Sequence, residues 1–188
     1  MKGQVEKVIG ANGKIDYLLN NAFVDMLFST DKHHANRLSS AINATPDQLS
    51  LDIDPASMAE HITVNVIGPA KVVEVLSSHL QKGSLVMNMT SGLGSIGRTI
   101  GDIGSKCTVY AISKGALNML AVHQSFNLKD KGVRVVVMDP GWVKTRMGGE
   151  GAILEPHESI GGMLKTIHGL GESDTAQFYQ YNGGKVPW

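Results

Sequence analysis

The sequence has little that would tie it to a membrane, a nucleic acid or an oxidising compartment. It contains a single cysteine, Cys107, so no disulfide can form within the chain. Its 17 basic and 17 acidic side chains cancel, and neither sign is clustered as nucleic-acid or anionic-membrane binding requires. No apolar run has the length of a signal peptide or a membrane span. We therefore expect a cytoplasmic protein with no nucleic-acid or membrane partner.

The composition is that of one folded domain. The chain has 188 residues, of which 42% are hydrophobic and 18% charged, enough apolar material for one core. A long polar loop over residues 29–54 is a candidate insertion or lid. It contains the pair His33-His34, but adjacent histidines point apart and no third ligand has metal spacing, so no metal site is expected.

Apolar runs that end in polar residues alternate with helical patterns along the chain. Three runs read as strands, and helical patterns cover about 55–80 and 110–131, so the order indicates an α/β fold. Polar groups at the carboxyl ends of parallel strands face the ligand crevice of such a sheet. The runs are Ile15–Ala22, which ends in Asn20-Asn21, Gly83–Gly92, which ends in Thr90-Ser91-Gly92, and Val133–Asp139, which leads into Pro140-Gly141.

Tyr110 and Lys114 are four residues apart, so a helix places a phenol and an ammonium on one face. A nearby cation favours the phenolate, which would prepare the tyrosine to give and take a proton. The pattern alone also fits a packed tyrosine. Likewise, Ser91 fits a turn residue, Asn65 a helix-kink residue and Thr145 a helix cap.

Taken together and in order, these motifs resemble the short-chain dehydrogenase/reductase family. Asn65, Ser91, Tyr110 and Lys114 match its catalytic tetrad. Residues 91–97, 140–149 and the terminal Val186-Pro187-Trp188 resemble its C-factor-like and small carbonyl-reductase-like branch. The cofactor-binding residues that the resemblance implies are Asn20, Asn21, Ala22, Tyr110, Lys114, Pro140, Gly141, Val143 and Thr145.

The resemblance implies a three-layer Rossmann-type, doubly wound parallel sheet and an oxidoreductase that uses NADP or NAD. Its substrate would be a small-molecule carbonyl or alcohol. Tyr110 would exchange the proton, Lys114 would stabilise the phenolate and hold the nicotinamide ribose, and Ser91 would bind the substrate oxygen. Asn65 would keep a helix locally open so that water can relay protons to Lys114.

The amino-terminal part departs from the family pattern. Residues 1–9 read as the end of a helix, and the glycine-rich strand–turn–helix that cradles the pyrophosphate is not found, so about 60 residues, two strand–helix units, are expected to be missing. Phe23 also replaces a family glycine. The Gly92-Leu-Gly94 and Gly169-Leu-Gly171 clusters read as turns. We therefore expect an amino-terminally truncated, partial Rossmann-type domain over residues 1–188.

Ancestry from a catalytic site leaves two other functions open. The chain could act as a non-catalytic interaction or regulatory protein, or it could use Tyr110, Ser91 and Lys114 without a dinucleotide, as a lyase or hydrolase. NADPH and NADH titrations distinguish these functions.

Three further expectations concern surfaces. Tyr110 lies 19 positions after Ser91. This separation predicts a bulged loop over the substrate mouth that tunes substrate choice. The 110–131 helix is expected to have an apolar stripe of Leu117, Met119, Leu120 and Phe126. Both this helix and the 55–80 helix have surplus apolar surface, and the 15–22 strand has an open edge. These features predict a homodimer or higher oligomer.

Overall fold

The computed structural model describes residues 2–10, 12–21 and 49–188. Its centre is a sheet of four parallel strands in the order β1-β2-β3-β4. Tyr17 of β1 lies opposite Leu85 of β2, and Leu85 lies opposite Arg134 of β3. The three predicted strands are present as β1 Tyr17–Asn20, β2 Leu85–Met89 and β3 Arg134–Asp139, and β4 Gln177–Gln180 completes the sheet.

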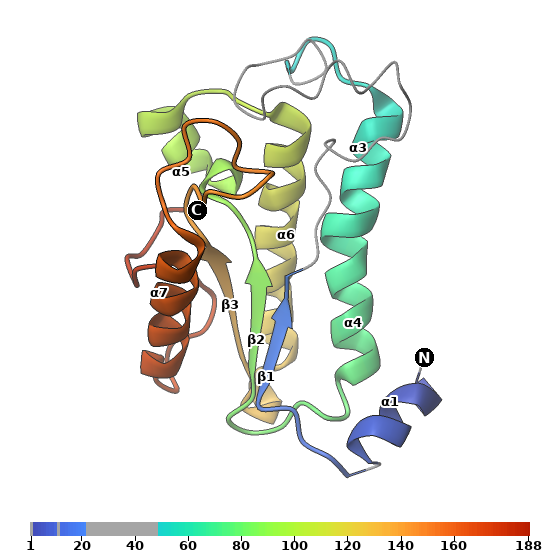
Figure 1. The fold of residues 1–188 in the computed structure, drawn as a ribbon. Helices are drawn as coiled ribbons and strands as arrows, with labels where there is room; N and C mark the ends of the chain where they lie inside the picture. Colours follow the sequence, from blue (N-terminus) through green and yellow to red (C-terminus); the bar gives the residue numbers. More distant parts are fainter. Residues whose placement is uncertain (1, 11, 22–48) are drawn as a thin grey trace.

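Helices cover both faces of this sheet (Figure 1). One face carries α3 (Pro55–Ile62), α4 (Gly68–Leu76) and α6 (Thr108–Asn127), and the other carries α7 (Pro156–Gly169). The helix α1 (Lys2–Ile9) precedes β1. The predicted α/β order and three-layer Rossmann-type architecture are confirmed. Because α7 lies on the opposite face, the β3–β4 connection has the opposite hand to the two before it.

Local signals set the helix ends. Asp54 caps α3 by accepting hydrogen bonds from the N–H groups of Ala56 and Ser57, and Pro55 occupies the first turn, where its missing N–H costs nothing. After α6, a 3-10 turn, η6 (Lys129–Lys131), ends at Gly132 with φ of 67°. Glycine adopts this left-handed conformation without strain, so the helical pattern predicted over about 110–131 ends where expected.

Side chains alternate between two apolar clusters, one on each face. Val86, Val135 and Val137 pack with Val73 of α4 and Ala121 of α6. Residues one position away in the strands pack with Ile167 of α7: Leu85, Met87, Met89, Val136 and Met138. We call these sides the α6 face and the α7 face. The period of two follows from the strand pleat.

The segment between β2 and α6 is helical rather than a bulged loop, so the predicted form of this segment is wrong. It consists of η4 (Gly92–Gly94), α5 (Ile96–Arg98) and a π-type turn, η5 (Thr99–Ile103). The side chain of Ser95 starts α5 by accepting a hydrogen bond from the Arg98 N–H. A serine at this position supplies the cap that the short helix needs.

The predicted apolar stripe of α6 is only partly correct. Leu117 is buried, but Met119 is 60% and Phe126 71% exposed. At 100° per residue, Met119 is turned about 200° and Phe126 about 180° from Leu117 around the helix, so both point away from the sheet.

No helix in the described ranges is long and apolar enough to cross a bilayer. Ala22, Phe23, His33-His34 and most of the 29–54 loop lie outside the described residues.

Candidate active site

The helix that precedes β2 opens locally at Asn65. Between α3 and α4 the chain forms a π-type turn, η3 (Thr63–Ile67), and Asn65 is fully buried within it. Such a turn inserts one extra residue into the helix and is frequent at functional sites. The Asn65 Nδ2 donates to Ser113 Oγ at 3.0 Å, and Ser113 Oγ donates to the Tyr110 carbonyl at 2.7 Å. Asn65 therefore contacts the turn of α6 that contains Tyr110 and Lys114.

Lys114 is a buried cation at the carboxyl edge of the sheet. It is 1% exposed, and its Nζ donates to the Met89 carbonyl, at the end of β2, at 2.9 Å. The same Nζ lies 5.5 Å from the centre of the Tyr110 ring. A buried charge is tolerated only with such partners. The helix spacing thus places the ammonium beside the phenol, as the sequence predicts.

Tyr110 is partly buried, and a second ring lies beside it. The His61 ring, which is 1% exposed, meets the Tyr110 ring edge-on, with centroids 6.5 Å apart. His61 Nδ1 lies 2.8 Å from the Ser57 carbonyl, so this nitrogen is the protonated one. His61 is one helical turn before Asn65, a spacing from which the sequence could have linked the two.

Ser91 follows β2 directly and caps the next turn. It is half-buried, and its Oγ accepts a hydrogen bond from the Leu93 N–H at 3.2 Å. Because the oxygen accepts in this contact, the hydroxyl hydrogen is the group that can be offered to a substrate oxygen. Ser91 stands two residues after Met89, whose carbonyl binds Lys114. The carboxyl end of β2 therefore brings Ser91 into the region of Lys114.

Buried amides connect the strand ends to α6. Asn20 Nδ2 donates to Asn88 Oδ1 at 2.7 Å, and Asn88 Nδ2 donates to Gln124 Oε1 at 3.1 Å. Satisfied networks of this kind specify one arrangement of the chain. Asn20 was predicted as a cofactor residue; in the structure it binds Asn88, while Asn21 is exposed. Ala22 lies outside the described residues.

A second buried pair joins β2 to α6. Thr90 Oγ1 donates to Asn118 Oδ1 at 2.6 Å, and Asn118 Nδ2 donates to the Gly94 carbonyl at 3.1 Å. Asn118 stands one helical turn after Lys114 and was not among the predicted residues. Its spacing of four from Lys114, and of eight from Tyr110, was the signal that could have found it.

The loop after β3 contains the remaining predicted residues. Ser159 Oγ donates to the Pro140 carbonyl at 2.7 Å, and Gly141 has φ of 77°. Val143 bridges to Leu154. Thr145 is exposed, and its hydroxyl accepts from the Gly148 N–H at 3.1 Å. The contacts of Val143 and Thr145 are thus with their own loop, which starts at the same sheet edge as Ser91 (Figure 1).

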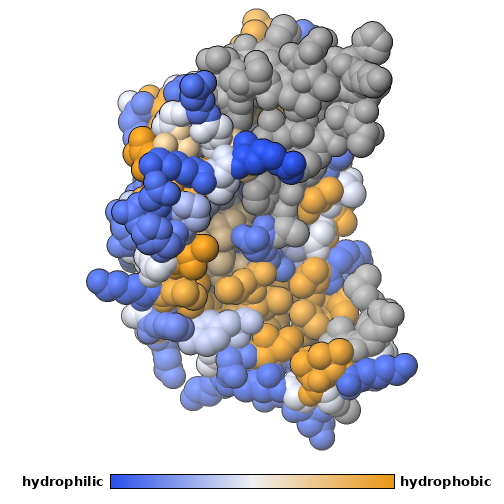
Figure 2. Space-filling view, viewed as in Figure 1, coloured by the Kyte–Doolittle hydropathy of each residue, from blue (hydrophilic) through white to orange (hydrophobic). Residues whose placement is uncertain are grey.

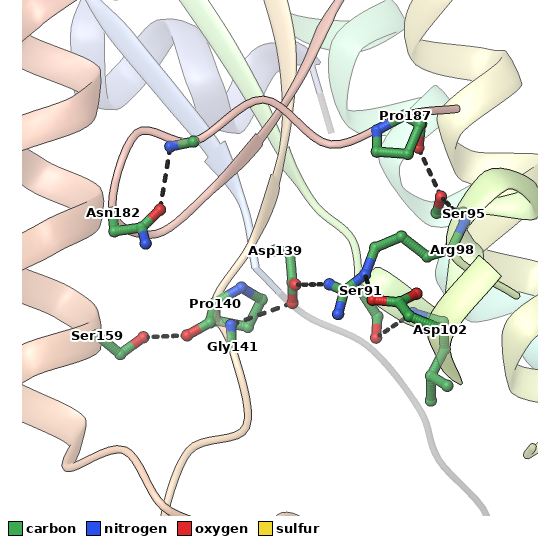
Figure 3. A network of polar contacts seen from close by, with 12 residues as sticks. Ser91, Ser95, Arg98, Asp102, Asp139, Pro140, Gly141, Ser159, Asn182 and Pro187 are labelled. Carbon is green, nitrogen blue, oxygen red and sulfur yellow. Dashed lines mark hydrogen bonds and ion pairs between the residues drawn. The ribbon is translucent and has the colours of Figure 1, made fainter. Parts of the chain in front are cut away.

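Asp139, the last residue of β3, was not predicted and is central to the polar network in Figure 3. It is 5% exposed. Burial raises the pKa of its carboxyl above the ordinary 3.8, while the N–H groups of Gly141 and Gly92 and the charge of Arg98 oppose that rise. Its place at a strand end, directly before Pro140, was the available sequence signal.

The glycines after Ser91 serve close packing. A Cβ on Gly94 would lie 2.8 Å from the Lys114 backbone, and one on Gly97 would lie 3.0 Å from Pro187. Gly92, Gly94 and Gly97 have the spacing of a dinucleotide fingerprint, but the helix that follows, α5, has three residues. The predicted turn is confirmed for Gly92–Gly94.

These groups fit one half of a dinucleotide. Lys114, which lies beside Tyr110, could hold a nicotinamide ribose, and the Pro140-Gly141 turn, which follows β3 at the carboxyl edge of the sheet, could hold the nicotinamide. Within the described ranges, no glycine-rich turn opens a long helix after a strand, which is the usual cradle for a pyrophosphate. Among the described residues, no group of three or more histidine, cysteine, aspartate or glutamate side chains could hold a metal ion.

Comparison with known proteins agrees with this geometry. The sequence model of the family described as short chain dehydrogenase matches residues 1–152. C-signal of Myxococcus xanthus is 35% identical over 178 residues, which cover 94% of each chain. The 1-hydroxy-2-glutathionyl-2-methyl-3-butene dehydrogenase of Rhodococcus sp. (strain AD45) is 31% identical over 144 residues, which cover 74% of this chain and 61% of that protein.

Two solved structures are similar over the whole of this chain. The NADPH-bound carbonyl reductase from chicken fatty liver aligns with a TM-score of 0.79 and 26% identity, and the match covers 71% of that chain. Carbonyl reductase Sniffer of D. melanogaster aligns with a TM-score of 0.80 and 25% identity, and the match again covers 71% of that chain.

Proposed function

The chain belongs to the short-chain dehydrogenase family, in its small carbonyl-reductase-like branch, and on that premise we propose that it interconverts a carbonyl and an alcohol with NADP or NAD. The observation that carries the proposal is the buried Lys114 ammonium, 5.5 Å from the Tyr110 ring centre. A cation held there lowers the free energy of a phenolate relative to a phenol. This makes Tyr110 the proposed acid and base.

The roles of the residues follow from what each can donate. The Tyr110 O–H gives its proton to the carbonyl oxygen in reduction and takes it back in oxidation. Ser91 donates a hydrogen bond to the same oxygen, and Lys114 stabilises the phenolate. Asn65, in its π-type turn, keeps the helix open for water that relays protons to Lys114. A bound nicotinamide supplies or accepts the hydride.

The proposed cofactor contacts come from the carboxyl ends of three strands. Lys114 would bind the nicotinamide ribose, and the turn at Pro140 and Gly141, with Val143 and Thr145, would hold the carboxamide. Asn20, Asn21 and Ala22 would line the same edge from β1. Gly141 has φ of 77°, and a Cβ there would lie 3.1 Å from the side chains of Leu154 and Tyr181, so glycine suits this turn.

A titration tests the proposal. NADPH and NADH are added to the purified chain, binding is followed by nucleotide fluorescence, and turnover is measured with a panel of aldehydes and ketones. We expect saturable binding and carbonyl-dependent oxidation of at least one nucleotide. Tyr110→Phe should retain binding and lose turnover, with Tyr17→Phe, at the amino end of β1, as the matched control. Absence of binding at millimolar nucleotide would contradict the proposal.

A second candidate function is that of an interaction or signalling protein. The observation in its favour is that the relative matched over 94% of both chains bears the name C-signal, whereas the dehydrogenase relative is matched over 61% of its length. Under this alternative, Tyr110→Phe and Lys114→Met would leave partner binding unchanged. Turnover without any nucleotide would instead indicate a lyase or hydrolase.

We also propose that the chain is a homo-oligomer. Ile67 after α3 is 47% exposed, and Met119 and Phe126 of α6 are 60% and 71% exposed. Figure 2 shows further hydrophobic residues over β1, where Tyr17 and Leu19 are 49% and 45% exposed. Apolar patches of this kind mark interaction sites.

Light scattering at micromolar concentration measures the assembly state. Met119→Glu should dissociate an oligomer built on α6, and Leu19→Glu one built on the β1 edge. The exposed Lys129→Glu substitution serves as the control for added negative charge. A monomeric wild-type chain would contradict the oligomer.

A further inference from the structure

The Asp139 carboxylate lies between the two turns that carry the substrate side and the cofactor side of the proposed site. On one side, Oδ1 accepts a hydrogen bond from the Gly141 N–H at 3.1 Å. On the other, the N–H of Gly92, the residue after Ser91, also acts on the carboxylate. One side chain therefore contacts both turns, and Figure 3 shows its contacts with Gly141 and Arg98.

Arg98 completes the contact. Its Nη1 lies 3.5 Å from Asp139 Oδ2, and its Nε lies 3.6 Å from Asp102 Oδ2. Among the described residues, Arg98 of α5 and, through it, Asp102 of η5 are the charged groups that face Asp139. The side chain of Arg98 is 26% exposed and the side chain of Asp139 is 8% exposed, so the acid is the more strongly desolvated member of the pair. The guanidinium can still be reached by water.

Gly92 leaves no room for a side chain between these groups. A Cβ at residue 92 would lie 2.6 Å from Arg98 Nη1 and 3.0 Å from Asp139 Oδ2. Both distances are inside van der Waals contact, and the atoms affected are the ends of side chains. An alanine at this position would therefore push the ion pair apart without altering any charge.

From this geometry we propose that ionised Asp139 is a positioning residue, which fixes the turn that follows Ser91 against the turn of Pro140 and Gly141. The inference rests on the proposed function for its catalytic consequence. Ser91 is adjacent to Gly92, and Pro140 is adjacent to Asp139, so a shift in either turn moves the substrate-binding hydroxyl relative to the cofactor side. Small displacements of this kind have large effects on rate.

Stability alone gives no reason for a charge at this position. Because the pKa of the buried carboxyl is raised, the folded chain holds its proton more tightly than the unfolded chain does. Stability then falls as the pH rises from 3.8 through the folded pKa. Asparagine keeps an oxygen for the Gly141 N–H and removes that cost, but its NH2 group replaces the Oδ2 that faces Arg98 Nη1, so the contact with Arg98 is lost. A structural role predicts that Asp139→Asn loses stability and activity together, whereas a positioning role predicts a loss of activity with a small change in Tm.

The first test needs no turnover. Amide 1H–15N shifts of Gly92 and Gly141 are followed from pH 4 to pH 8 in the full chain. We expect both to titrate with one shared midpoint, which vanishes in Asp139→Asn and moves upward in Arg98→Gln because the opposing charge is lost. Independent midpoints, or a titration that persists in Asp139→Asn, would overturn the proposal. This result stands even if the chain binds no nucleotide.

The second test measures function. Asp139→Asn and Gly92→Ala should each lower kcat/KM about tenfold to a hundredfold, and the Tm of Asp139→Asn at pH 7.5 should change little, because removal of the buried charge offsets loss of the Arg98 contact. The wild-type kcat should fall at low pH with the midpoint found by NMR. Gly161→Ala, in α7 on the other face of the sheet, is the control, because no atom lies within 4 Å of its Cβ position. Wild-type kinetics in both variants, or a Tm loss that matches the activity loss, would overturn the proposal.

Discussion

The two faces of the sheet differ in how their side chains change along the strands. On the α6 face, β2 proceeds from Val86 to Asn88 and then to Thr90, which follows the strand, and β3 proceeds from Val137 to Asp139. Buried polar groups thus accumulate toward the carboxyl end. On the α7 face the same strands are apolar after Arg134, the first residue of β3, with Leu85, Met87, Met89, Val136 and Met138.

This difference separates stability from chemistry. The α7 face contains the groups that gain free energy simply by leaving water, about 1.5–3 kcal/mol for each large side chain. The α6 face accepts buried polar groups, each of which must find a partner. Lys114 meets the Met89 carbonyl, and Asn88 meets Asn20 and Gln124. Substitutions of the buried polar residues on the α6 face should therefore change function as well as stability, and those of the apolar residues on the α7 face should change stability alone.

The largest expected effect is that of Tyr110→Phe. Removing one hydroxyl should lower kcat by about 10²–10⁴-fold, because the proton of the proposed reaction comes from that group. The Tm should stay within about 1 °C of wild type, since the ring and its edge contact with His61 remain. Steady-state kinetics and calorimetry measure the two. Proportional losses of Tm and activity would place Tyr110 in the core instead.

Lys114→Met comes next and sharpens the contrast between charge and packing. Methionine has a similar length, so we expect a Tm close to wild type, because removal of a buried charge offsets loss of the bond to the Met89 carbonyl. Turnover and nucleotide affinity should both fall at least tenfold. Fluorescence titration and kinetics measure these, with exposed Lys129→Met as the control. Unchanged nucleotide affinity would contradict the ribose contact.

Met87→Ala tests the apolar face. Met87 is 2% exposed in the α7-face cluster, so truncation should lower the free energy of unfolding by about 2–5 kcal/mol. Met87→Leu should cost less than about 1.5 kcal/mol. Urea unfolding measures both. Nucleotide affinity of the folded fraction should equal that of wild type, and a specific loss of affinity would break the comparison between the faces.

Asn88→Ala tests the polar face at its centre. The variant leaves the amides of Asn20 and Gln124 without their shared partner, which should cost about 1–3 kcal/mol of unfolding free energy. Unlike Met87→Ala, it should also weaken nucleotide binding. Asn88 holds Asn20 at the end of β1, and Asn20 and Asn21 are proposed cofactor residues. Exposed Asn127→Ala is the control. A loss of stability with full nucleotide affinity would make this network purely structural.

The smallest effect concerns alkaline stability on the α7 face. Tyr179 donates to Asp174 Oδ1 at 2.9 Å, and burial, that bond and the Asp174 charge raise the pKa of Tyr179 to about 12. The unfolded chain ionises near 10.0 and the folded chain does not, so stability falls as the pH rises from 10 toward 12. Urea unfolding at pH 9 and pH 11 should show a smaller fall in Tyr179→Phe. An equal fall in the wild-type chain and in Tyr179→Phe would contradict the raised pKa of Tyr179.

Much of this fold could be read from the sequence because its signals are local. Apolar runs mark β1, β2 and β3, Asp54-Pro55 starts α3, and Gly132 ends the turn after α6. Each depends on neighbours in the chain, which act through backbone geometry. The segment between Ser91 and Tyr110 was harder, since its short helices α5 and η5 have weak periodicity and depend on the tail at Pro187 and Trp188 for hydrogen bonds.

The candidate site divides in the same way. One helical turn separates Tyr110 from Lys114, and Ser91 stands at the end of a strand. Their residue types and their spacing in the sequence are therefore enough to propose them as site residues. Asn118 and Asp139 are satisfied by groups distant in sequence, Thr90 and Arg98 respectively. The roles of the four tetrad residues stay predictions that the variants above test.

By itself, the sequence determined the elements, their order and the residues able to carry proton chemistry, because propensity, capping and the two periodicities are properties of short segments. Only the tertiary structure decided which face of the sheet became polar, that Asn65 lies in a widened turn against Ser113, and that Gly92 leaves space for Arg98 and Asp139 to meet. Those outcomes depend on close packing between segments that are far apart in the chain, where a single Cβ or an unpaired buried amide changes the result.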